Sequence, residues 1–328
     1  MLLESQQSAE ARSWAILSGA GLNKKRYAHP SGKHYTTIKM PSLHKPVQLF
    51  GLALAILLLG HPTPGQGGQV TTATFPSITL GGPYPYAVYL PDQPAESGSG
   101  YPVVYLLHGS FGSTTDWLEQ GQLEATADTL ISAGAIPPTV VVMPGSQSWW
   151  LDGHNEAAAT AFLGDLIPHI ESTYPVIQER SGRFIAGLSA GGYGAARFAL
   201  MHPERFAAAA ALSPATYVPL PPANSSAYRH PAYLDGAGNF DQELWQQTNY
   251  TAYWDDYRDS GLTVPFYINS GDHDEFAIAY HATVLYETLR QHQPEAVELR
   301  IVDGAHDWEV WRSTLPDTLT FLLSHYQP

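Results

Sequence analysis

The five residues Gly187-Leu188-Ser189-Ala190-Gly191 constrain the fold of this chain more than any other feature of its sequence. They follow directly on the run 183–186, which is apolar after Arg183, and lead into a segment rich in glycine and alanine, 191–196. A buried strand that turns sharply into a helix holds the central serine in a strained conformation, with its hydroxyl above the sheet. The flanking glycines avoid clashes with the neighbouring strand or helix. The pattern therefore predicts a strand–turn–helix unit that exposes Ser189.

Strands and helices are predicted to alternate over most of the chain. Two β-runs, 70–80 and 84–90, are separated by Gly81-Gly82-Pro83, which is typical of a hairpin at the edge of a sheet. Continuous apolar runs, as in strands buried on both faces, occupy 102–107 and 138–143, and further strands are expected at 183–188, 206–212, 264–268 and 297–302. Helical spacing of apolar residues covers 117–133, 157–174, 190–201, 276–291 and 308–326. This alternation predicts an α/β fold with a mostly parallel central sheet and helices on both faces.

One long segment, 214–261, interrupts this alternation. It is rich in proline, asparagine and aromatic residues. Insertions of this length without regular structure are uncommon in compact domains, and they often serve the function. Two interpretations stay open at this point: a cap inserted over the functional site, or a surface excursion packed by its own aromatic side chains.

The N-terminal part of the chain differs in character from the rest. Residues 47–59 are apolar apart from Gln48; they follow a basic stretch and precede the small, turn-forming residues 62–68. This order is that of a secretory signal, and the apolar run is short for a membrane span. On this interpretation translation starts at Met40 and the protein is secreted or extracytoplasmic. We therefore expect three parts: a non-native or disordered extension (1–39), a signal peptide or uncleaved N-terminal anchor (40–68) and the folded domain (69–328).

The charges are unevenly divided along the chain. Residues 1–68 hold seven of the sixteen lysines and arginines but two of the thirty aspartates and glutamates, and no lysine follows Lys45. A body this acidic repels nucleic acid and anionic lipid surfaces, so we expect no nucleic-acid partner and no membrane contact except through an uncleaved N-terminal segment. The sequence has no cysteine, which excludes disulfides, a thiol nucleophile and a thiolate metal site. We expect no metal and no cofactor.

Ser189 needs a basic partner to act as a nucleophile. A serine hydroxyl attacks poorly until a base removes its proton, and the base needs a group that holds its tautomer. After a turn of this kind the acid follows the serine and the histidine comes last. His306 stands directly after the strand 297–302 and before the last helix, where a loop opens onto the same edge of the sheet. His306 is therefore the expected base.

Three carboxylates crowd the loop that follows the strand 264–268. Asp274 is the expected acid, with Asp272 as the alternative. Glu275 stands where the next helix begins, and a negative charge there suits the helix dipole. The segment lacks the alternating oxygen ligands of a twelve-residue calcium loop. It therefore predicts a group that orients the base and not a metal site.

The same chemistry develops negative charge on an oxygen, which two backbone N–H groups are expected to receive. One is the N–H of Ala190, the residue after the serine. The other belongs to the loop after the strand 102–107, which reads His108-Gly109-Ser110-Phe111-Gly112. The N–H of Ser110 is the favoured donor there, whereas His108 is expected to shape the loop.

Four segments of the chain together resemble one family, the esterase D-like branch of the α/β-hydrolases. That branch includes feruloyl esterases, S-formylglutathione hydrolases and the antigen 85 mycolyltransferases. The resemblance covers residues 70–328 and implies an α/β-hydrolase fold with Ser189 as nucleophile, Asp274 as acid and His306 as base. It also implies that Ser110 and Ala190 donate to the oxyanion. The matching segments are Tyr105-Leu106-Leu107-His108-Gly109 with Asp116-Trp117, Gly187-Leu188-Ser189-Ala190-Gly191-Gly192, Gly271-Asp272-His273-Asp274, and Gly304-Ala305-His306-Asp307-Trp308-Glu309-Val310-Trp311.

The sequence thus predicts an exported serine carboxylesterase that forms an acyl-enzyme on Ser189 and passes the acyl group to water. Feruloyl or other aryl esters are the first expectation for the substrate, and short-chain acyl esters of carbohydrate the second. Trp149 and Trp150, after the strand 138–143, are expected to stack an aromatic acyl group or a sugar ring. Two alternatives stay open: an acyltransferase similar to antigen 85 with a sugar or lipid acceptor, and a surface binding protein without catalysis.

Overall fold

The computed structural model of the protein describes residues 67–95, 98 and 100–327. The expected extension 1–39, and all of the expected signal or anchor segment 40–68 except its last two residues, lie outside the described residues. The first strand begins at Gln69. Among the described residues, no helix is both long enough and apolar enough to cross a membrane.

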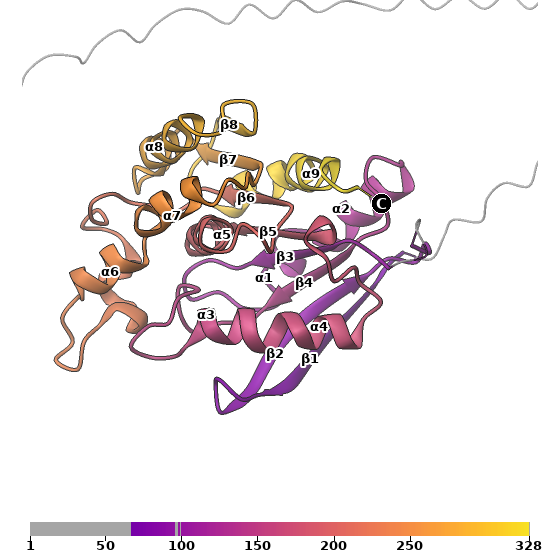
Figure 1. The fold of residues 1–328 in the computed structure, drawn as a ribbon, viewed down its shortest axis with the longest axis horizontal. Coiled ribbons are helices and arrows are strands. Elements are labelled where there is room, and N and C mark those ends of the chain that lie inside the picture. The colour runs from indigo at the N-terminus through magenta and orange to yellow at the C-terminus, as the bar shows by residue number, and fades with distance from the viewer. Residues whose placement is uncertain (1–66, 96–97, 99, 328) are drawn as a thin grey trace, which may run out of the picture. The chain divides into compact units, whose positions relative to one another are not determined.

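Eight strands form one sheet in this part of the chain (Figure 1). Their spatial order is β1-β2-β4-β3-β5-β6-β7-β8. β1 pairs antiparallel with β2 and β2 with β4, whereas every pair from β4 through β3 to β8 is parallel. The predicted edge hairpin and the mostly parallel sheet are both confirmed. The strands are β1 (Gln69–Ser77), β2 (Gly82–Leu90), β3 (Val103–Leu107), β4 (Val140–Pro144), β5 (Arg183–Leu188), β6 (Ala208–Leu212), β7 (Phe266–Gly271) and β8 (Val297–Val302).

Helices cover both faces of the sheet, as the sequence predicts (Figure 1). One face is covered by α4 (Ile167–Thr173), α5 (Ala190–Met201) and α8 (Ile278–Arg290), and the other by α2 (Leu123–Ser132) and α9 (Trp308–Ser324). Each face buries its own core of apolar side chains.

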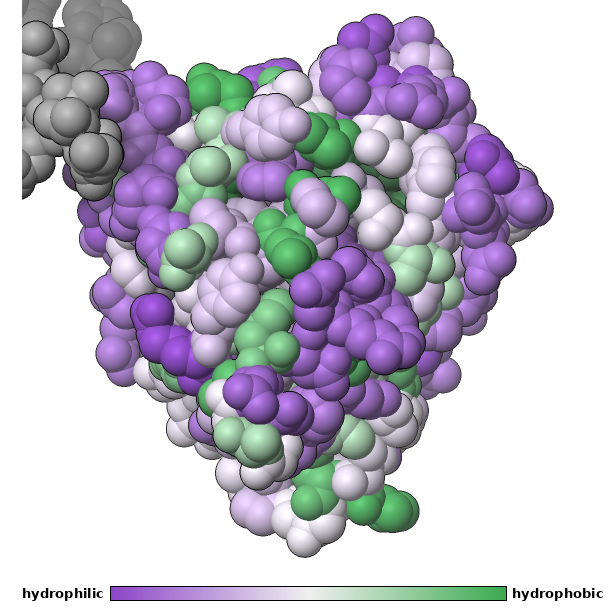
Figure 2. Space-filling model, turned by 90° about the vertical axis from the view of Figure 1, so that its left-hand side faces the viewer, coloured by the Kyte–Doolittle hydropathy of each residue, from purple (hydrophilic) through white to green (hydrophobic). Residues whose placement is uncertain are grey.

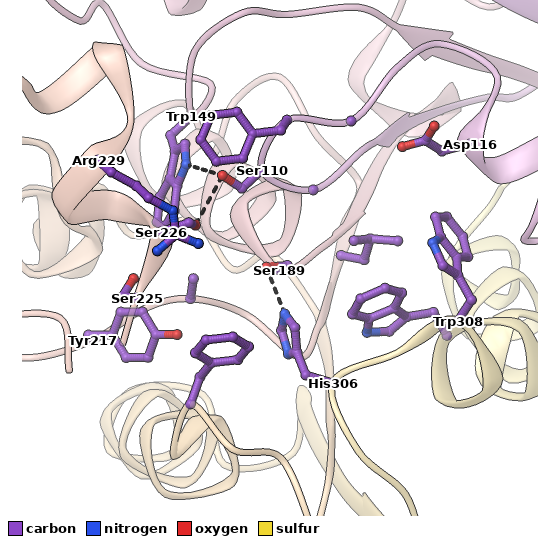
Figure 3. A pocket seen from close by; sticks show the side chains of 17 residues that line it. Ser110, Asp116, Trp149, Ser189, Tyr217, Ser225, Ser226, Arg229, His306 and Trp308 are labelled. Carbon is purple, nitrogen blue, oxygen red and sulfur yellow. Dashed lines mark hydrogen bonds between the residues drawn. The ribbon is translucent and has the colours of Figure 1, made fainter. Parts of the chain in front are cut away.

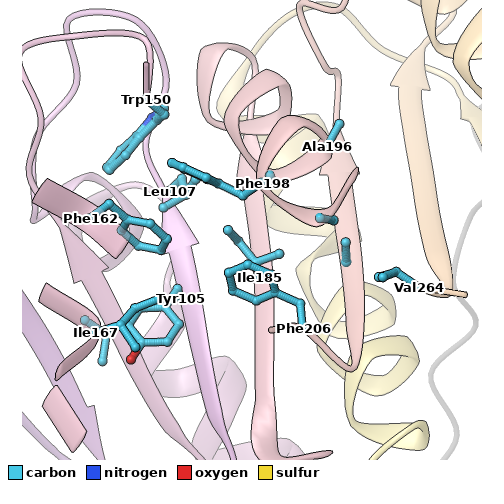
Figure 4. Packing of buried hydrophobic residues seen from close by; sticks show 14 of the residues in the cluster. Tyr105, Leu107, Trp150, Phe162, Ile167, Ile185, Ala196, Phe198, Phe206 and Val264 are labelled. Carbon is cyan, nitrogen blue, oxygen red and sulfur yellow. The ribbon is translucent and has the colours of Figure 1, made fainter. Parts of the chain in front are cut away.

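The two cores explain why the central strands are apolar without alternation. Successive side chains of a strand point to opposite faces. In β3, Tyr105 joins the core under α4 and α5, and Leu106 joins the core under α2 and α9. Phe162 lies edge-on to Tyr105 and stacks on Phe198 of α5, with ring centroids 4.7 Å apart in the second pair (Figure 4). Both faces of the strand are thus buried. A polar side chain on either face would lower the stability of the fold, because it would be buried without a hydrogen-bond partner.

Two predicted helices are interrupted in the structure. The predicted helix 117–133 divides into α1 (Asp116–Glu119) and α2, because Gln122 adopts a left-handed conformation with φ 54°. The predicted helix 157–174 consists of α3 (Ala158–Ala161), a π-helical turn η1 (Phe162–Leu166) and α4. The spacing of apolar residues indicates which side of a helix faces the core. It does not indicate a change from α-helical to π-helical hydrogen bonding within that helix.

The insertion 214–261 lies between β6 and β7 and is built from short helices. Trp245 packs at its centre, with ring centroids 5.2 Å from Tyr233, 5.6 Å from Tyr193 of α5 and 5.9 Å from Trp149. The insertion is therefore packed by its own aromatic residues and anchored on the helix that follows Ser189. Figure 2 views the molecule from the left of Figure 1, where apolar residues appear as small groups between polar ones. The helices are η3 (Ser226–Arg229), η4 (Pro231–Tyr233), α6 (Gln242–Thr248), η5 (Tyr250–Tyr253) and α7 (Trp254–Asp259).

Candidate active site

Ser189 lies at a strained turn between β5 and α5. Its backbone has φ 53° and ψ −115°, a combination that costs a non-glycine residue about 1–3 kcal/mol and that clusters at functional sites. The turn is tight enough that a Cβ on Gly187 would come within 2.4 Å of the Gly191 backbone. A Cβ on Gly191 would come within 2.5 Å of the Leu107 carbonyl oxygen. Only glycine fits at these two positions, which explains the sequence pattern around the serine.

Three predicted residues meet at the carboxyl edge of the sheet. The Nε2 atom of His306 lies 2.9 Å from the Ser189 hydroxyl oxygen, and its Nδ1 lies 2.7 Å from Oδ2 of Asp274. The carboxylate can only accept from Nδ1–H, so Nε2 carries the lone pair that faces the serine O–H. The Asp274 side chain is fully buried and that of His306 is 10% exposed. The arrangement can therefore remove the serine proton and stabilise the imidazolium that forms.

Parallel neighbours β7 and β8 bring the acid and the base together. Asp274 follows β7 and His306 follows β8, and these strands pair in parallel register. The second carboxylate oxygen of Asp274 accepts the N–H of Phe276 at 2.9 Å. This bond fixes the carboxylate, so that its other oxygen remains available to the imidazole.

Asp272, the alternative acid, has a different role in the structure. Its side chain is 46% exposed and pairs with His273. It accepts the N–H of Gly304, and this hydrogen bond lowers the pKa of its carboxyl. Asp272 thus ties the loop after β7 to the loop that carries His306, without contact to the imidazole.

Two aromatic rings hold the His306 side chain from the sides. Phe276 and Trp311 both stand edge-on to the imidazole, with ring centroids 4.9 Å and 5.0 Å away. Trp311 is itself fixed, because its indole N–H donates to the Ser213 hydroxyl at 3.1 Å. The sequence gives no direct signal for this packing, since both aromatics fall where helix periodicity already accounts for them.

The loop after β3 presents Ser110 to the same pocket as Ser189 and His306. Within the described residues, no protein acceptor takes the backbone N–H of Ser110 or Ala190. Ala190 begins α5, where N–H groups have no intrahelical partner. Both predicted donors thus have no protein acceptor among the described residues.

His108 fixes this loop from within. Its Nδ1 lies 2.7 Å from the Gly109 carbonyl oxygen, and its Nε2 accepts the N–H of Ser146 at 3.1 Å. Burial lowers the pKa of His108, which keeps it neutral and suited to these two bonds. The position of His108 agrees with the expectation that it shapes the loop.

A pocket of about 260 Å³ opens over Ser189 (Figure 3). Figure 3 shows Ser225, Ser226 and Arg229 of the insertion on one side of Ser189, and Trp308 and Asp116 on the other. The insertion therefore contributes to the pocket as well as packing on itself. Sequence reasoning missed this set of lining residues, because nothing in the insertion's composition says which of its side chains point inward.

The two predicted tryptophans take different positions. Trp149 lines the pocket, but it is 1% exposed and its indole N–H donates to the Ser110 hydroxyl at 3.0 Å. It supports the loop and offers no open face for stacking. The prediction that Trp150 contacts a ligand is wrong. Trp150 is completely buried, packs against Phe162 (Figure 4) and donates to the His108 carbonyl. Its backbone φ is 61°, and its ring does not line the pocket.

In the part of the chain that the structure describes, one group of three side chains is close enough together to bind a metal ion. Ligand atoms of Asp272, His273 and Asp303 lie within 4.8 Å of one another. All three are exposed, and Asp272 is engaged with Gly304. This surface group does not touch the pocket over Ser189.

The fold and the site define the class of protein: an α/β-hydrolase, with a serine at the strand–helix turn after β5 and a histidine after the last strand. The family model described as "Putative esterase" matches residues 77–322, which is more than half of the chain. The chain therefore belongs to this esterase family.

Individual relatives agree with this class. The chain is 32% identical to an endo-1,4-β-xylanase/feruloyl esterase of Xylanibacter ruminicola over 162 residues, which cover 46% of this chain and 22% of that protein. It is 25% identical to an acetyl esterase of Caldicellulosiruptor saccharolyticus over 226 residues, which cover 67% of this chain and 82% of that protein. The chain spans about a quarter of the length of the first curated relatives that it matches.

Solved structures share the fold. A ferulic acid esterase superposes with a TM-score of 0.68 at 27% identity, covering 79% of this chain and 98% of that one. The S-formylglutathione hydrolase of Staphylococcus aureus superposes with a TM-score of 0.64 at 18% identity, covering 79% of this chain and 100% of that one. The second likeness is one of fold alone.

Proposed function

We propose that this protein is a serine carboxylesterase that cleaves carboxylic esters through an acyl-enzyme on Ser189. The observation that carries the proposal is the continuous hydrogen-bonded chain from Asp274 through His306 to Ser189, at a turn whose backbone is strained. Membership in the esterase family supports the same chemistry. A binding protein would have no need for a strained serine beside an oriented imidazole.

The geometry gives each group a step. His306 takes the Ser189 proton as the hydroxyl oxygen attacks the ester carbonyl, and Asp274 stabilises the imidazolium. The carbonyl oxygen becomes negative and accepts hydrogen bonds from the N–H groups of Ser110 and Ala190, each worth about 3 kcal/mol in the transition state. The C–O bond to the alcohol then breaks, and His306 gives its proton to the departing alkoxide. Water repeats the sequence on the acyl-enzyme, which releases the acid and restores Ser189.

Aryl acids, feruloyl above all, and short acyl groups are the proposed acyl substrates, on a carbohydrate alcohol. The names of the relatives, a feruloyl esterase and an acetyl esterase, support both. A pocket of about 260 Å³ holds one ring or a short acyl chain and not a polymer. Phe111, 63% exposed at the pocket lining, replaces the two tryptophans as the proposed stacking surface.

Export remains part of the proposal and rests on the sequence of residues 40–68, with 69–328 as the exported domain. Determination of the N-terminus of the protein recovered outside the cell tests this directly. We expect a start near Gly67, whereas an exported protein that begins at Met1 would contradict it.

Replacement of the nucleophile tests the proposed chemistry. Ser189→Ala should abolish hydrolysis of 4-nitrophenyl acetate and labelling by a fluorophosphonate probe while the circular dichroism spectrum stays unchanged. Ser324→Ala, at the exposed end of α9, is the matched control and should keep full activity. Full activity of Ser189→Ala would overturn the mechanism. Rates on methyl ferulate, acetylated xylan and 4-nitrophenyl esters of increasing length then define the acyl preference.

A further inference from the structure

Arg229 differs from the other arginines of the folded part of the chain, because its guanidinium has no hydrogen-bond or ion-pair partner among the described residues. After residue 68 the sequence holds nine arginines and no lysine, against 28 aspartates and glutamates. Eight of the nine donate a hydrogen bond or form an ion pair with the protein. Within the described residues, no carboxylate, carbonyl or aromatic ring engages the guanidinium of Arg229.

This unpaired cation lines the pocket over Ser189. It is the last residue of η3 in the insertion, and Figure 3 shows its guanidinium beside Ser226, on the same side as Ser225. Among the described residues that line the pocket, Arg229 is the one lysine or arginine. The Ser226 hydroxyl bonds to that of Ser110 at 3.0 Å, so the backbone next to Arg229 is tied to the loop that receives the oxyanion.

The pocket is also electrostatically polarised. Asp116 lines it on the side opposite to Arg229, with Ser189 between them (Figure 3). The Asp116 carboxylate accepts from Ser113 through both the backbone N–H and the hydroxyl. An anionic group on a bound ester is therefore drawn to the Arg229 side and repelled from the Asp116 side, and this fixes the direction in which such a molecule lies across Ser189.

We propose that Arg229 binds an anionic oxygen group, a carboxylate or a phosphate, on the acyl or alcohol part of the ester, and so selects charged substrates. The inference rests on the proposed esterase function and adds a substrate class to it. A guanidinium offers donors in a fixed fork that matches two oxygens of such a group. The acidic body of the protein repels anions, so a free cation in the pocket supplies the attraction that the rest of the surface denies.

Matched substrates test this proposal. On the acyl side the pair is 4-nitrophenyl hemisuccinate and 4-nitrophenyl butyrate. On the alcohol side the set is acetoxyacetate, 2-acetoxyethyl phosphate and ethyl acetate, which carry a carboxylate, a phosphate and no charge. The readout is the ratio of kcat/KM for each charged ester to that of its neutral partner. The proteins are wild type, Arg229→Gln, Arg229→Lys and the control Arg258→Gln, whose arginine pairs with Asp255 on the surface.

We expect wild type to favour the charged ester in at least one set, and Arg229→Gln to lower that ratio about tenfold. Arg229→Lys should recover part of the ratio, and Arg258→Gln should match wild type. The preference should weaken in 0.5 M NaCl for wild type and Arg258→Gln but not for Arg229→Gln, because salt screens the attraction to the guanidinium. The substrate set whose ratio changes in Arg229→Gln shows whether the anionic group lies on the acyl or the alcohol side. Within the alcohol set, the ester that responds shows whether Arg229 prefers a carboxylate or a phosphate.

Two results would overturn the inference, and each is distinct from failure of the esterase proposal. Equal ratios for wild type and Arg229→Gln in every set, with neutral esters still hydrolysed, would exclude the selective role and leave the esterase intact. If wild type cleaves no ester, calorimetric binding of the same esters to Ser189→Ala and to Ser189→Ala/Arg229→Gln decides the matter. Tighter binding of a charged ester that is lost with Arg229 would support the site, and no difference would reject it.

Discussion

Trp311 stands edge-on to His306, with ring centroids 5.0 Å apart, and anchors its own indole N–H on the hydroxyl of Ser213. Ser213 follows β6, so three parallel strands contribute to the position of the imidazole: β6 through Ser213, β7 through Asp274 and β8 through the loop of His306. The orientation of the base is therefore a property of the sheet and of α9 together.

This packing predicts a moderate loss on Trp311→Phe. The variant keeps a ring against His306 but removes the bond to the buried Ser213 hydroxyl, which costs about 1 kcal/mol of folding free energy. We expect kcat for 4-nitrophenyl acetate to fall several-fold and the urea midpoint to drop. Trp254→Phe, in α7, should leave kcat as in wild type. Equal kcat for both variants would show that Trp311 does not position the base.

The two neighbouring aspartates should differ sharply in their effect on catalysis. Asp274→Asn removes the buried carboxylate that orients Nδ1–H, and kcat should fall by roughly 10⁴-fold with little change in KM. Asp272→Asn keeps an oxygen to accept the Gly304 N–H and should lower kcat less than about threefold, since its energetic role is that of one exposed hydrogen bond. Steady-state kinetics at pH 7.5 compare them. A larger loss for Asp272→Asn would make it the acid.

The close approach at Gly191 predicts that replacing this glycine by alanine destabilises the protein, whereas the same replacement at Gly164 does not. In Gly191→Ala the new Cβ would lie 2.5 Å from the Leu107 carbonyl oxygen and 2.6 Å from that of His108. We expect a loss of about 1–3 kcal/mol in the free energy of unfolding and lower activity, because the loop before Ser110 must move. In Gly164→Ala no heavy atom lies within 4 Å, so stability should stay the same or rise by up to about 1 kcal/mol. Chemical denaturation of both variants measures this, and a stable, active Gly191→Ala would contradict it.

His230 should make the protein less stable in mild acid. Burial lowers the pKa of His230 to about 4, whereas the unfolded chain has the ordinary histidine pKa of about 6.5. Between these values the unfolded state binds a proton that the folded state does not, so this contribution to stability is complete above pH 6.5 and is lost as the pH falls toward 4. His230 is buried, and we expect a loss of about 2 kcal/mol between pH 6.5 and 4.

A single variant isolates this contribution. The Nδ1 atom of His230 accepts the N–H of Ala232 at 3.2 Å, and the side-chain oxygen of an asparagine can take the same bond. His230→Asn should therefore unfold in urea with a weaker dependence on pH between 6.5 and 4.5 than wild type. Parallel pH profiles for the two proteins would show that His230 does not titrate in this range.

The sequence was sufficient to predict the order of strands and helices and the residues that meet at Ser189. Short stretches of sequence carry both signals. The tight turn permits only glycine at positions 187 and 191, and a residue that follows a parallel strand must lie at the carboxyl edge of the sheet. The sequence was insufficient where direction matters. Trp149 and Trp150 are adjacent and alike, yet the ring of Trp150 is buried in the core and that of Trp149 lies beside Ser110.

The insertion shows the same limit more strongly. Its aromatic content predicts a packed segment, and Trp245 fulfils that expectation. Arg229 is exposed and also lines the pocket, a position that no periodicity of the sequence encodes. The sequence around a charged residue of this kind does not indicate where its side chain points. Only the three-dimensional structure shows that Arg229 lines the site.

The hydroxyl contact between Ser226 and Ser110 has a consequence for redesign. It joins two segments that are 116 residues apart, one of which lines the pocket with Arg229 while the other carries the proposed oxyanion donor Ser110. Grafting a foreign insertion to alter selectivity would sever that contact and disturb turnover as a side effect. Swaps between relatives should therefore carry both loops as a unit, and libraries confined to the insertion should hold Ser226 constant.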